Sequence, residues 1–120
     1  MSNQFAVTAI PFKLPDDGFT ELIGTVRADD EFVILHVQTS LMGEWNKEER
    51  IIKIEIAAVE DVHLKTSFFG DKLCLVPKRE ESFQAVPGVQ LGELVLKTRK
   101  KDRSAVESLV EAVDRGIVGF

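Results

Sequence analysis

The stretch that decides the fold lies near the end of the chain and reads ELVLKTRKKDRSAVESLVEAVDRG, from Glu93 to Gly116. Its first part alternates apolar and polar residues, which is typical of a half-buried strand, and places Leu94, Leu96 and Thr98 on one face. After Arg103 the apolar period changes from two residues to between three and four. The stretch therefore predicts a strand that leads directly into an amphipathic helix.

The predicted helix has one apolar stripe with spacing i, i+3, i+4, i+7 and i+11. The stripe consists of Val106, Leu109, Val110, Val113 and Ile117. Ser104 and Glu107 have the spacing of a capping box, in which each side chain accepts an unpaired backbone N–H at the helix start. Gly116 suits the position just after a helix, where left-handed backbone is needed. We predict that the helix starts at Ser104 and ends at Gly116.

On the N-terminal side of this stretch, alternation of apolar and polar residues with period two recurs along most of the chain. The predicted strands are TELIGTVR, FVILHVQT, RIIKIEI, VHLKTSF, KLCLVP, SFQAV and ELVLKTR. Two tight turns, ADDE and FGD, and a longer loop over residues 41–49 separate some of them. In VHLKTSF the alternation places Phe68 on the same face as Val62 and Leu64. Prolines punctuate the start, so residues 1–18 are predicted to be an N-terminal arm and residues 19–120 the domain.

This order of elements resembles the pleckstrin-homology (PH) superfold, and residues 50–115 resemble the PH-like domains of bacteria. The features that carry the resemblance are Val59 with Val62 in a short crossing, Phe69-Gly70 in a hairpin, and the basic run KTRKKDR before the helix. The resemblance implies a mainly β barrel of about seven antiparallel strands in two orthogonal sheets, capped by one C-terminal α-helix. It also implies a non-enzymatic scaffold that binds proteins, peptides or lipid headgroups, and that self-associates in some bacterial members.

Composition narrows the classes of function. The chain has 120 residues, which favours one domain, and a net charge of −5, which disfavours a general nucleic-acid binder. A single cysteine excludes an intrachain disulfide and favours a reducing compartment. The N-terminus has no basic leader with a long apolar run, and no stretch of about 18 apolar residues occurs. We expect a cytoplasmic protein without a transmembrane segment.

No established catalytic or metal-binding motif occurs in the sequence. The two histidines, His36 and His63, lie far from each other and from Cys74, so they could form a site only through folding. Cys74 lies in the apolar run LCLV, which favours a buried and unreactive thiol. We therefore expect no enzymatic activity, no metal and no cofactor. A catalytic pair made of Cys74 and either histidine is the remaining enzyme hypothesis.

The densest basic cluster is the run before the helix. It contains Lys97, Arg99, Lys100, Lys101 and Arg103. One interpretation is a contact surface for anionic lipid headgroups or an acidic partner. The favoured interpretation is that these cations are solvated at a strand–helix junction. The loop at which many PH domains bind phosphates reads VRADDEF here, and its three carboxylates would repel a phosphate.

Four apolar residues are candidates for a partner-binding surface. Met42 and Trp45 lie in the predicted loop, and Val118 and Phe120 lie beyond the predicted helix end. Aromatic residues and methionine at such positions are frequent interface anchors, although they can equally close the end of a barrel. The first functional hypothesis is a non-enzymatic PH-like interaction module that binds a protein partner, most simply itself as a homo-oligomer. The alternative is a peripheral binder of anionic lipid headgroups.

Overall fold

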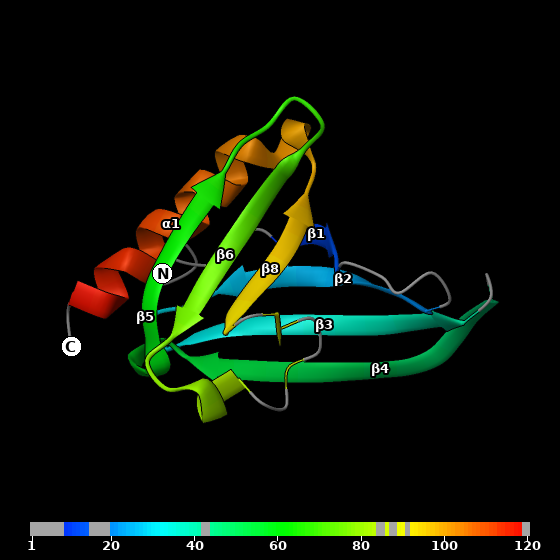
Figure 1. The fold of residues 1–120 in the computed structure, drawn as a ribbon, viewed down its shortest axis with the longest axis horizontal. Helices are drawn as coiled ribbons and strands as arrows, with labels where there is room; N and C mark the ends of the chain where they lie inside the picture. Colours follow the sequence, from blue (N-terminus) through cyan, green and yellow to red (C-terminus); the bar gives the residue numbers. More distant parts are fainter. Residues whose placement is uncertain are drawn as a thin grey trace, which may run out of the picture.

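The structure is a computed structural model that describes residues 9–14, 20–41, 44–83, 86, 89–90 and 92–118 (Figure 1). The strands are β1 (Ile10–Lys13), β2 (Thr20–Ala28), β3 (Phe32–Leu41), β4 (Glu44–Glu55), β5 (Val59–Lys65), β6 (Asp71–Pro77), β7 (Val89–Gln90) and β8 (Glu93–Thr98). Short 3-10 helices are η2 (Ile56–Ala58), η3 (Glu80–Phe83) and η4 (Lys100–Asp102), and the α-helix is α1 (Arg103–Val118).

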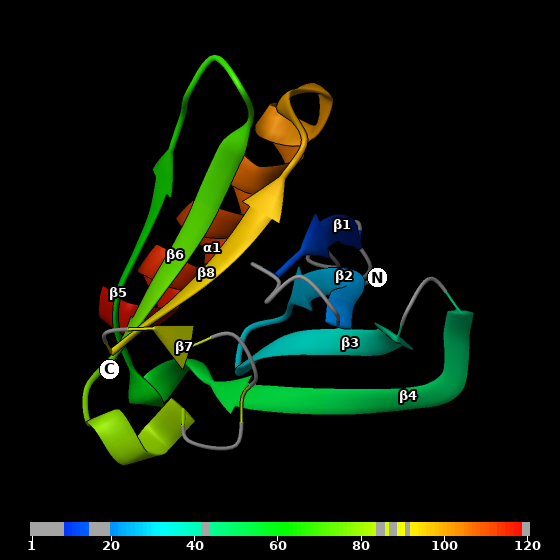
Figure 2. The same cartoon turned by 45° about the vertical axis from the view of Figure 1, so that its right-hand side comes forward.

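The strands form one open antiparallel sheet. The hydrogen-bonded order is β4-β3-β2-β1-β8-β6-β5, and β7 adds to β8. A single residue pair, Lys13 with Lys97, joins β1 to β8 and so connects the two halves. Figures 1 and 2 show β5, β6 and β8 running steeply across the direction of β2, β3 and β4. The predicted mainly β fold with a C-terminal helix is confirmed. The described strands form one sheet that is not closed, and a barrel of two orthogonal sheets stays a prediction.

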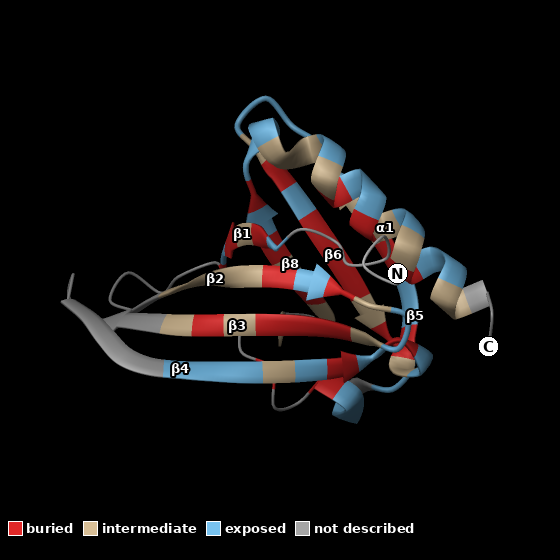
Figure 3. Ribbon diagram, turned by 180° about the vertical axis from the view of Figure 1, so that it is seen from behind, coloured by how far each residue is buried: buried red, intermediate tan, exposed pale blue. Residues whose placement is uncertain are grey.

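The core lies between the two halves of the sheet and one side of α1, as the buried residues in Figure 3 show. The predicted inward faces are confirmed on several elements. They include Val33, Leu35 and Val37 of β3, Leu94 and Leu96 of β8, and Val106, Leu109 and Val113 of α1. Because α1 packs against β5, η2 and β2, it contacts both halves of the sheet. Helix docking therefore contributes to fixing one half against the other.

Residues 10–13, part of the stretch assigned to an N-terminal arm, form the central strand β1. Ile10 and Phe12 are buried, and β1 pairs with β2 along its length. Pro11 is tolerated within this strand although proline is rare in central strands. The other pairing edge, toward β8, uses only one residue pair, so few ladder bonds are lost there.

Three predicted local structures were wrong. The start of the predicted strand SFQAV, Ser82 and Phe83, belongs to η3 and not to a strand. The predicted loop over residues 41–49 is largely strand: Leu41 pairs with Glu44, and β4 runs on from there. Strand β5 ends at Lys65, so the alternation does not continue to Phe68.

The helix also departs from its predicted ends. The chain is already helical through η4, and α1 starts at Arg103, so Ser104 lies within the first turn and is not its cap. At the other end, Gly116 lies inside α1. A Cβ at Gly116 would lie 2.8 Å from Cγ2 of Ile56. This glycine therefore serves the close approach of α1 to η2 and does not end the helix.

Candidate functional site

Four lysines stand opposite one another across four neighbouring strands. Lys13 of β1 pairs with Lys97 of β8, Lys97 pairs with Lys72 of β6, and Lys72 pairs with Lys65 of β5. Directly opposed residues of antiparallel strands point to the same face of a sheet, and all four lysines are exposed. We call this set the lysine row. It lies on the outer face, the side of β5, β6 and β8 opposite the core.

The lysine row concentrates positive charge in a protein whose net charge is negative. Neighbouring strands lie about 4.8 Å apart, so the row extends over roughly 14 Å. Among the described residues, none of the four ammonium groups forms an ion pair with a carboxylate. Like charges placed directly opposite destabilise a sheet. The arrangement is therefore one that a bound anion would relieve.

The hairpin between β5 and β6, which we call the hairpin tip (residues 66–70), presents two aromatic rings to solvent. Phe68 is 81% exposed and Phe69 is 95% exposed, and their rings make an edge-to-face contact at 5.3 Å. Gly70 has φ of 134°, a value that side-chain-bearing residues rarely adopt, as the sequence predicted for this turn. The tip follows directly after the Lys65–Lys72 pair, so the aromatic rings border the lysine row.

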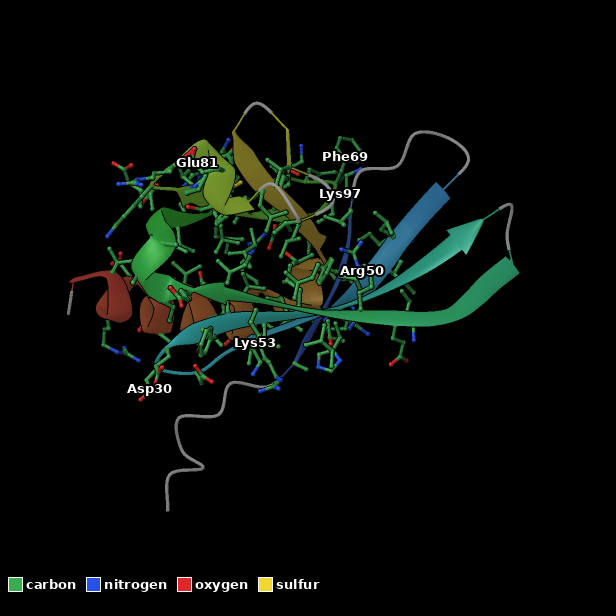
Figure 4. All side chains as sticks on the ribbon, turned by 90° about the horizontal axis from the view of Figure 1, so that it is seen from below. Asp30, Arg50, Lys53, Phe69, Glu81 and Lys97 are labelled. Carbon is green, nitrogen blue, oxygen red and sulfur yellow. The ribbon has the colours of Figure 1, made fainter. Side chains whose placement is uncertain are left out.

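Figure 4 shows Phe69 and Lys97 on the same side of the molecule. The ammonium group of Lys100, in η4, lies 4.9 Å from the centre of the Phe68 ring and donates to the Phe68 carbonyl oxygen at 3.1 Å. Lys101 is exposed beside it. The hairpin tip, the lysine row and Lys100 with Lys101 together form what we call the cationic–aromatic face.

Two cations of the predicted basic cluster form ion pairs. Arg99, which precedes η4, donates to Asp102 at its end at 2.7 Å, in an exposed contact. Arg103 makes a bidentate pair with Asp71, whose side chain is fully buried; both N···O distances are 2.8 Å. This hydrogen bonding to Arg103 lowers the pKa of Asp71, and burial acts in the opposite direction. Of the five predicted contact residues, Lys97, Lys100 and Lys101 therefore lie on the cationic–aromatic face.

The Asp71–Arg103 pair also explains how the face is positioned. Asp71 is the first residue of β6 and Arg103 the first of α1, so the pair ties the hairpin to the helix start. The backbone of Ser67 also contributes to lowering the pKa of Asp71. A buried charge needs such partners because an unpaired one is costly to desolvate. The pair fixes the base of the hairpin tip, while the rings of Phe68 and Phe69 stay exposed to solvent.

The histidines lie in different parts of the sheet. His36 is in β3 and lines a shallow cleft of about 300 Å³ with Gly24 and Glu49 among its walls. His63 is in β5, directly opposite Cys74 of β6. Cys74 is buried, as predicted, and burial raises the pKa of its thiol. Folding thus brings His63, but not His36, into a cluster with Cys74 among the described residues.

In the loop between β2 and β3, the Asp29 carboxylate is hydrogen-bonded to the backbone of the same loop. Oδ1 of Asp29 accepts the backbone N–H groups of Glu31 and Phe32, at 2.8 and 2.7 Å. The Asp29 N–H donates to the Phe32 carbonyl oxygen, which completes the predicted tight turn. The expectation that this carboxylate-rich turn does not bind phosphate stays a prediction.

The predicted partner-binding residues lie largely outside the described part. Met42 and Phe120 are not among the described residues. The backbone of Trp45 belongs to β4, where it pairs with Ser40, and Val118 is the last residue of α1. Their side chains are not described, so their role in partner binding stays a prediction.

Sequence reasoning missed the lysine row and the exposed aromatic pair. The four lysines are scattered over residues 13–97 and meet only through strand register. The exposure of Phe68 could have been foreseen, because a strand that enters a tight turn at Gly70 must stop alternating before it. The lysine row had no comparable local signal.

Two further findings concern the whole chain. Among the described residues, no helix combines the length and the apolar character needed to cross a membrane. Comparison with known proteins finds no family model, no curated protein and no solved structure that matches this chain.

Proposed function

We propose that this chain is a non-enzymatic interaction module with a PH-like fold, and that its cationic–aromatic face attaches it to anionic membrane surfaces. The PH-like assignment is supported by the strand order β4-β3-β2-β1-β8-β6-β5 and by a C-terminal helix that contacts both halves. The two halves crossing at the β1–β8 corner are compatible with the two orthogonal sheets that the resemblance implies. The membrane assignment rests on the placement of Phe68 and Phe69 beside the lysine row.

The chemistry of the face matches the boundary layer of an anionic bilayer. Exposed aromatic side chains gain free energy by entering the zone between headgroups and acyl chains, and lysines gain about 1 kcal/mol each near an anionic surface. Because the rings lie on a turn beyond the last strand pair, they can enter this zone while the lysines stay at phosphate level. A surface built only for solubility would not require two phenylalanines more than four-fifths exposed.

The experiment is sedimentation of the protein with vesicles of phosphatidylcholine alone and of phosphatidylcholine with phosphatidylserine. We expect binding only to the anionic vesicles, with an affinity that falls as salt is raised. Replacing both Phe68 and Phe69 by serine should weaken this binding at least about tenfold, because partial burial of two aromatic rings is lost. The matched control is Ile51→Ser, since Ile51 is an exposed apolar residue on the distant strand β4, 61% exposed.

The outcome separates the proposal from its alternatives. Equal binding to neutral and anionic vesicles would remove the role of the lysine row. Equal weakening by Ile51→Ser would show that the loss is not specific to the hairpin tip. If neither vesicle type binds the native chain under low-salt conditions, the membrane assignment is wrong and a protein partner is the better hypothesis.

A second candidate function, self-association, is favoured by the free edge of β4. Among the described residues, β4 has a strand partner only on its β3 side. Such an edge can pair with a second copy, and exposed Ile51 adds apolar surface to it. Charged residues along the strand, among them Glu49, Arg50 and Lys53, oppose uncontrolled pairing. Light scattering during size exclusion tests this: Ile51→Lys should reduce the mass of a homo-oligomer to that of one chain, whereas a strictly monomeric native chain excludes it.

A further inference from the structure

We infer that the outer face carries a zinc-binding site formed by His63, Cys74 and Glu93. These residues come from three neighbouring strands, β5, β6 and β8. Strand register brings them together: His63 is directly opposite Cys74, and Cys74 is opposite Val95, two residues from Glu93. One ligand atom from each side chain lies within 4.8 Å of the other two. The site uses none of the side chains of the lysine row or the hairpin tip, although it lies on the same outer face.

The spacing of the ligand atoms approaches that of a zinc site. With metal–ligand distances of about 2.0–2.3 Å, ligand atoms of a tetrahedral zinc ion lie about 3.4–3.6 Å apart. The distance from Nε2 of His63 to Oε2 of Glu93 is 3.6 Å. The sulfur of Cys74 would need to approach by about 1.2 Å at most to complete the set. Side-chain rotation suffices for a shift of this size.

A second observation points to a metal ligand at His63. Its Nδ1 lies 2.9 Å from Oδ2 of Asp61, and its Nε2 faces Glu93. Zinc-bound histidines almost always donate their second ring N–H to a carboxylate or carbonyl, which orients the ring and leaves the other nitrogen for the metal. The Asp61 carboxylate supplies this support. The ring is thus already held as a metal-bound histidine would be.

The type and charge of the ligands favour zinc over harder cations. A thiolate and an imidazole bind zinc better than they bind magnesium or calcium, which prefer oxygen ligands. A thiolate at Cys74 and the Glu93 carboxylate would neutralise the two charges of the ion. Three protein ligands leave the fourth position of the ion to a water molecule.

Access to the site is consistent with binding from solution. Cys74 is fully buried, whereas the side chains of His63 and Glu93 are 35% and 26% exposed. The sulfur therefore forms the floor of the site, and the other two ligands line its open side. The sequence did not predict this arrangement because it depends on pairing between β5, β6 and β8.

The experiment is a competition titration of Zn²⁺ between a chromophoric chelator and the tag-free, metal-stripped chain in a non-thiol reductant. We expect one zinc ion per chain, with an affinity at least about hundredfold lower in Cys74→Ser and His63→Gln. Asp61→Asn should lower it about tenfold through its effect on the ring. The matched control His36→Gln should bind as the native chain does. Circular dichroism checks that each variant is folded.

Cobalt supplies a readout that needs no variant. Co²⁺ bound by the native chain should show the strong near-ultraviolet absorption of a thiolate–cobalt bond, and addition of Zn²⁺ should remove it. A cobalt spectrum without this absorption would overturn the assignment of Cys74. Zinc binding that is equal in the native chain and in folded His63→Gln, or equally weakened by His36→Gln, would overturn the site.

Discussion

The lysine row leads to a prediction about stability that needs no ligand. Lys97 has two lysines opposite it, Lys13 on β1 and Lys72 on β6, whereas Lys65 at the end of the row has only one, Lys72. The row contains three neighbouring pairs of like charge. Lys97→Thr removes two of them and Lys65→Thr removes one. We therefore expect both substitutions to stabilise the unbound chain, the first about twice as much as the second.

The size of the effect follows from the spacing. An exposed like-charge pair across neighbouring strands, with charges roughly 5 Å apart, costs about 0.2–0.5 kcal/mol. Lys97→Thr should thus raise the free energy of unfolding by about 0.4–1 kcal/mol at low salt, and Lys65→Thr by about half of that. Threonine is chosen because it has a high strand propensity. Since the same residue replaces lysine at both positions, its intrinsic propensity contributes equally to the two changes in unfolding free energy.

The assay is urea denaturation followed by circular dichroism, at about 20 mM and about 1 M salt. The Debye length falls to about 3 Å at 1 M, which is shorter than the lysine spacing, so the charge contribution should largely disappear. The salt-dependent part of the change is the quantity to compare, because intrinsic propensity does not depend on salt. In the vesicle assay the same Lys97→Thr substitution should act in the opposite direction and weaken binding.

Three outcomes would contradict this account of the lysine row. Equal salt-dependent stabilisation by the two substitutions would mean that the number of opposed lysines does not determine the effect. Destabilisation by Lys97→Thr at low salt would mean that the lysines are compensated in the folded chain. Stabilisation together with unchanged vesicle binding would separate the row from membrane attachment.

Three further predictions concern packing and pH. Arg103→Gln should lower the free energy of unfolding most at neutral pH, because the pair with Arg103 lowers the folded-state pKa of Asp71 and so stabilises the fold above the unfolded pKa. This loss of stability should shrink as pH falls below about 3.9, the ordinary pKa of an Asp, because Asp71 then becomes protonated. Urea midpoints measured across pH check this, and a loss that does not depend on pH would contradict it. Gly24→Ala should destabilise the chain strongly, because the new Cβ would lie 1.8 Å from a backbone oxygen of β3. In Gly116→Ala the new Cβ would meet only a side chain, at 2.8 Å, and the helix would gain propensity. Thermal melting should therefore show the larger loss of stability for Gly24→Ala. Leu109→Asp should unfold the chain, since it would bury an unpaired carboxylate at a cost of several kcal/mol; a folded circular dichroism spectrum would show that α1 is not docked.

The local sequence pattern predicted secondary structure and burial correctly where these depend on residues close by in the chain. Alternation identified β2, β3, β5, β6 and β8, and the apolar stripe identified the docked side of α1. The same rules failed where a local contact overrode the period. Phe83 and Val86 are buried three residues apart around η3, and Phe68 follows the end of β5.

The amino-acid sequence by itself determined the fold class, the terminal helix and the lack of an intrachain disulfide, because period, turn chemistry and residue counts are properties of short segments or of composition. Only the tertiary structure decided which distant residues share a face. Lys13 meets Lys97, and His63 meets Cys74, through strand register, and a shift of one residue would send each to the opposite face. The tertiary structure also determined which cations of the basic run are paired, because Arg103 pairs with buried Asp71, which lies 32 residues away in the chain.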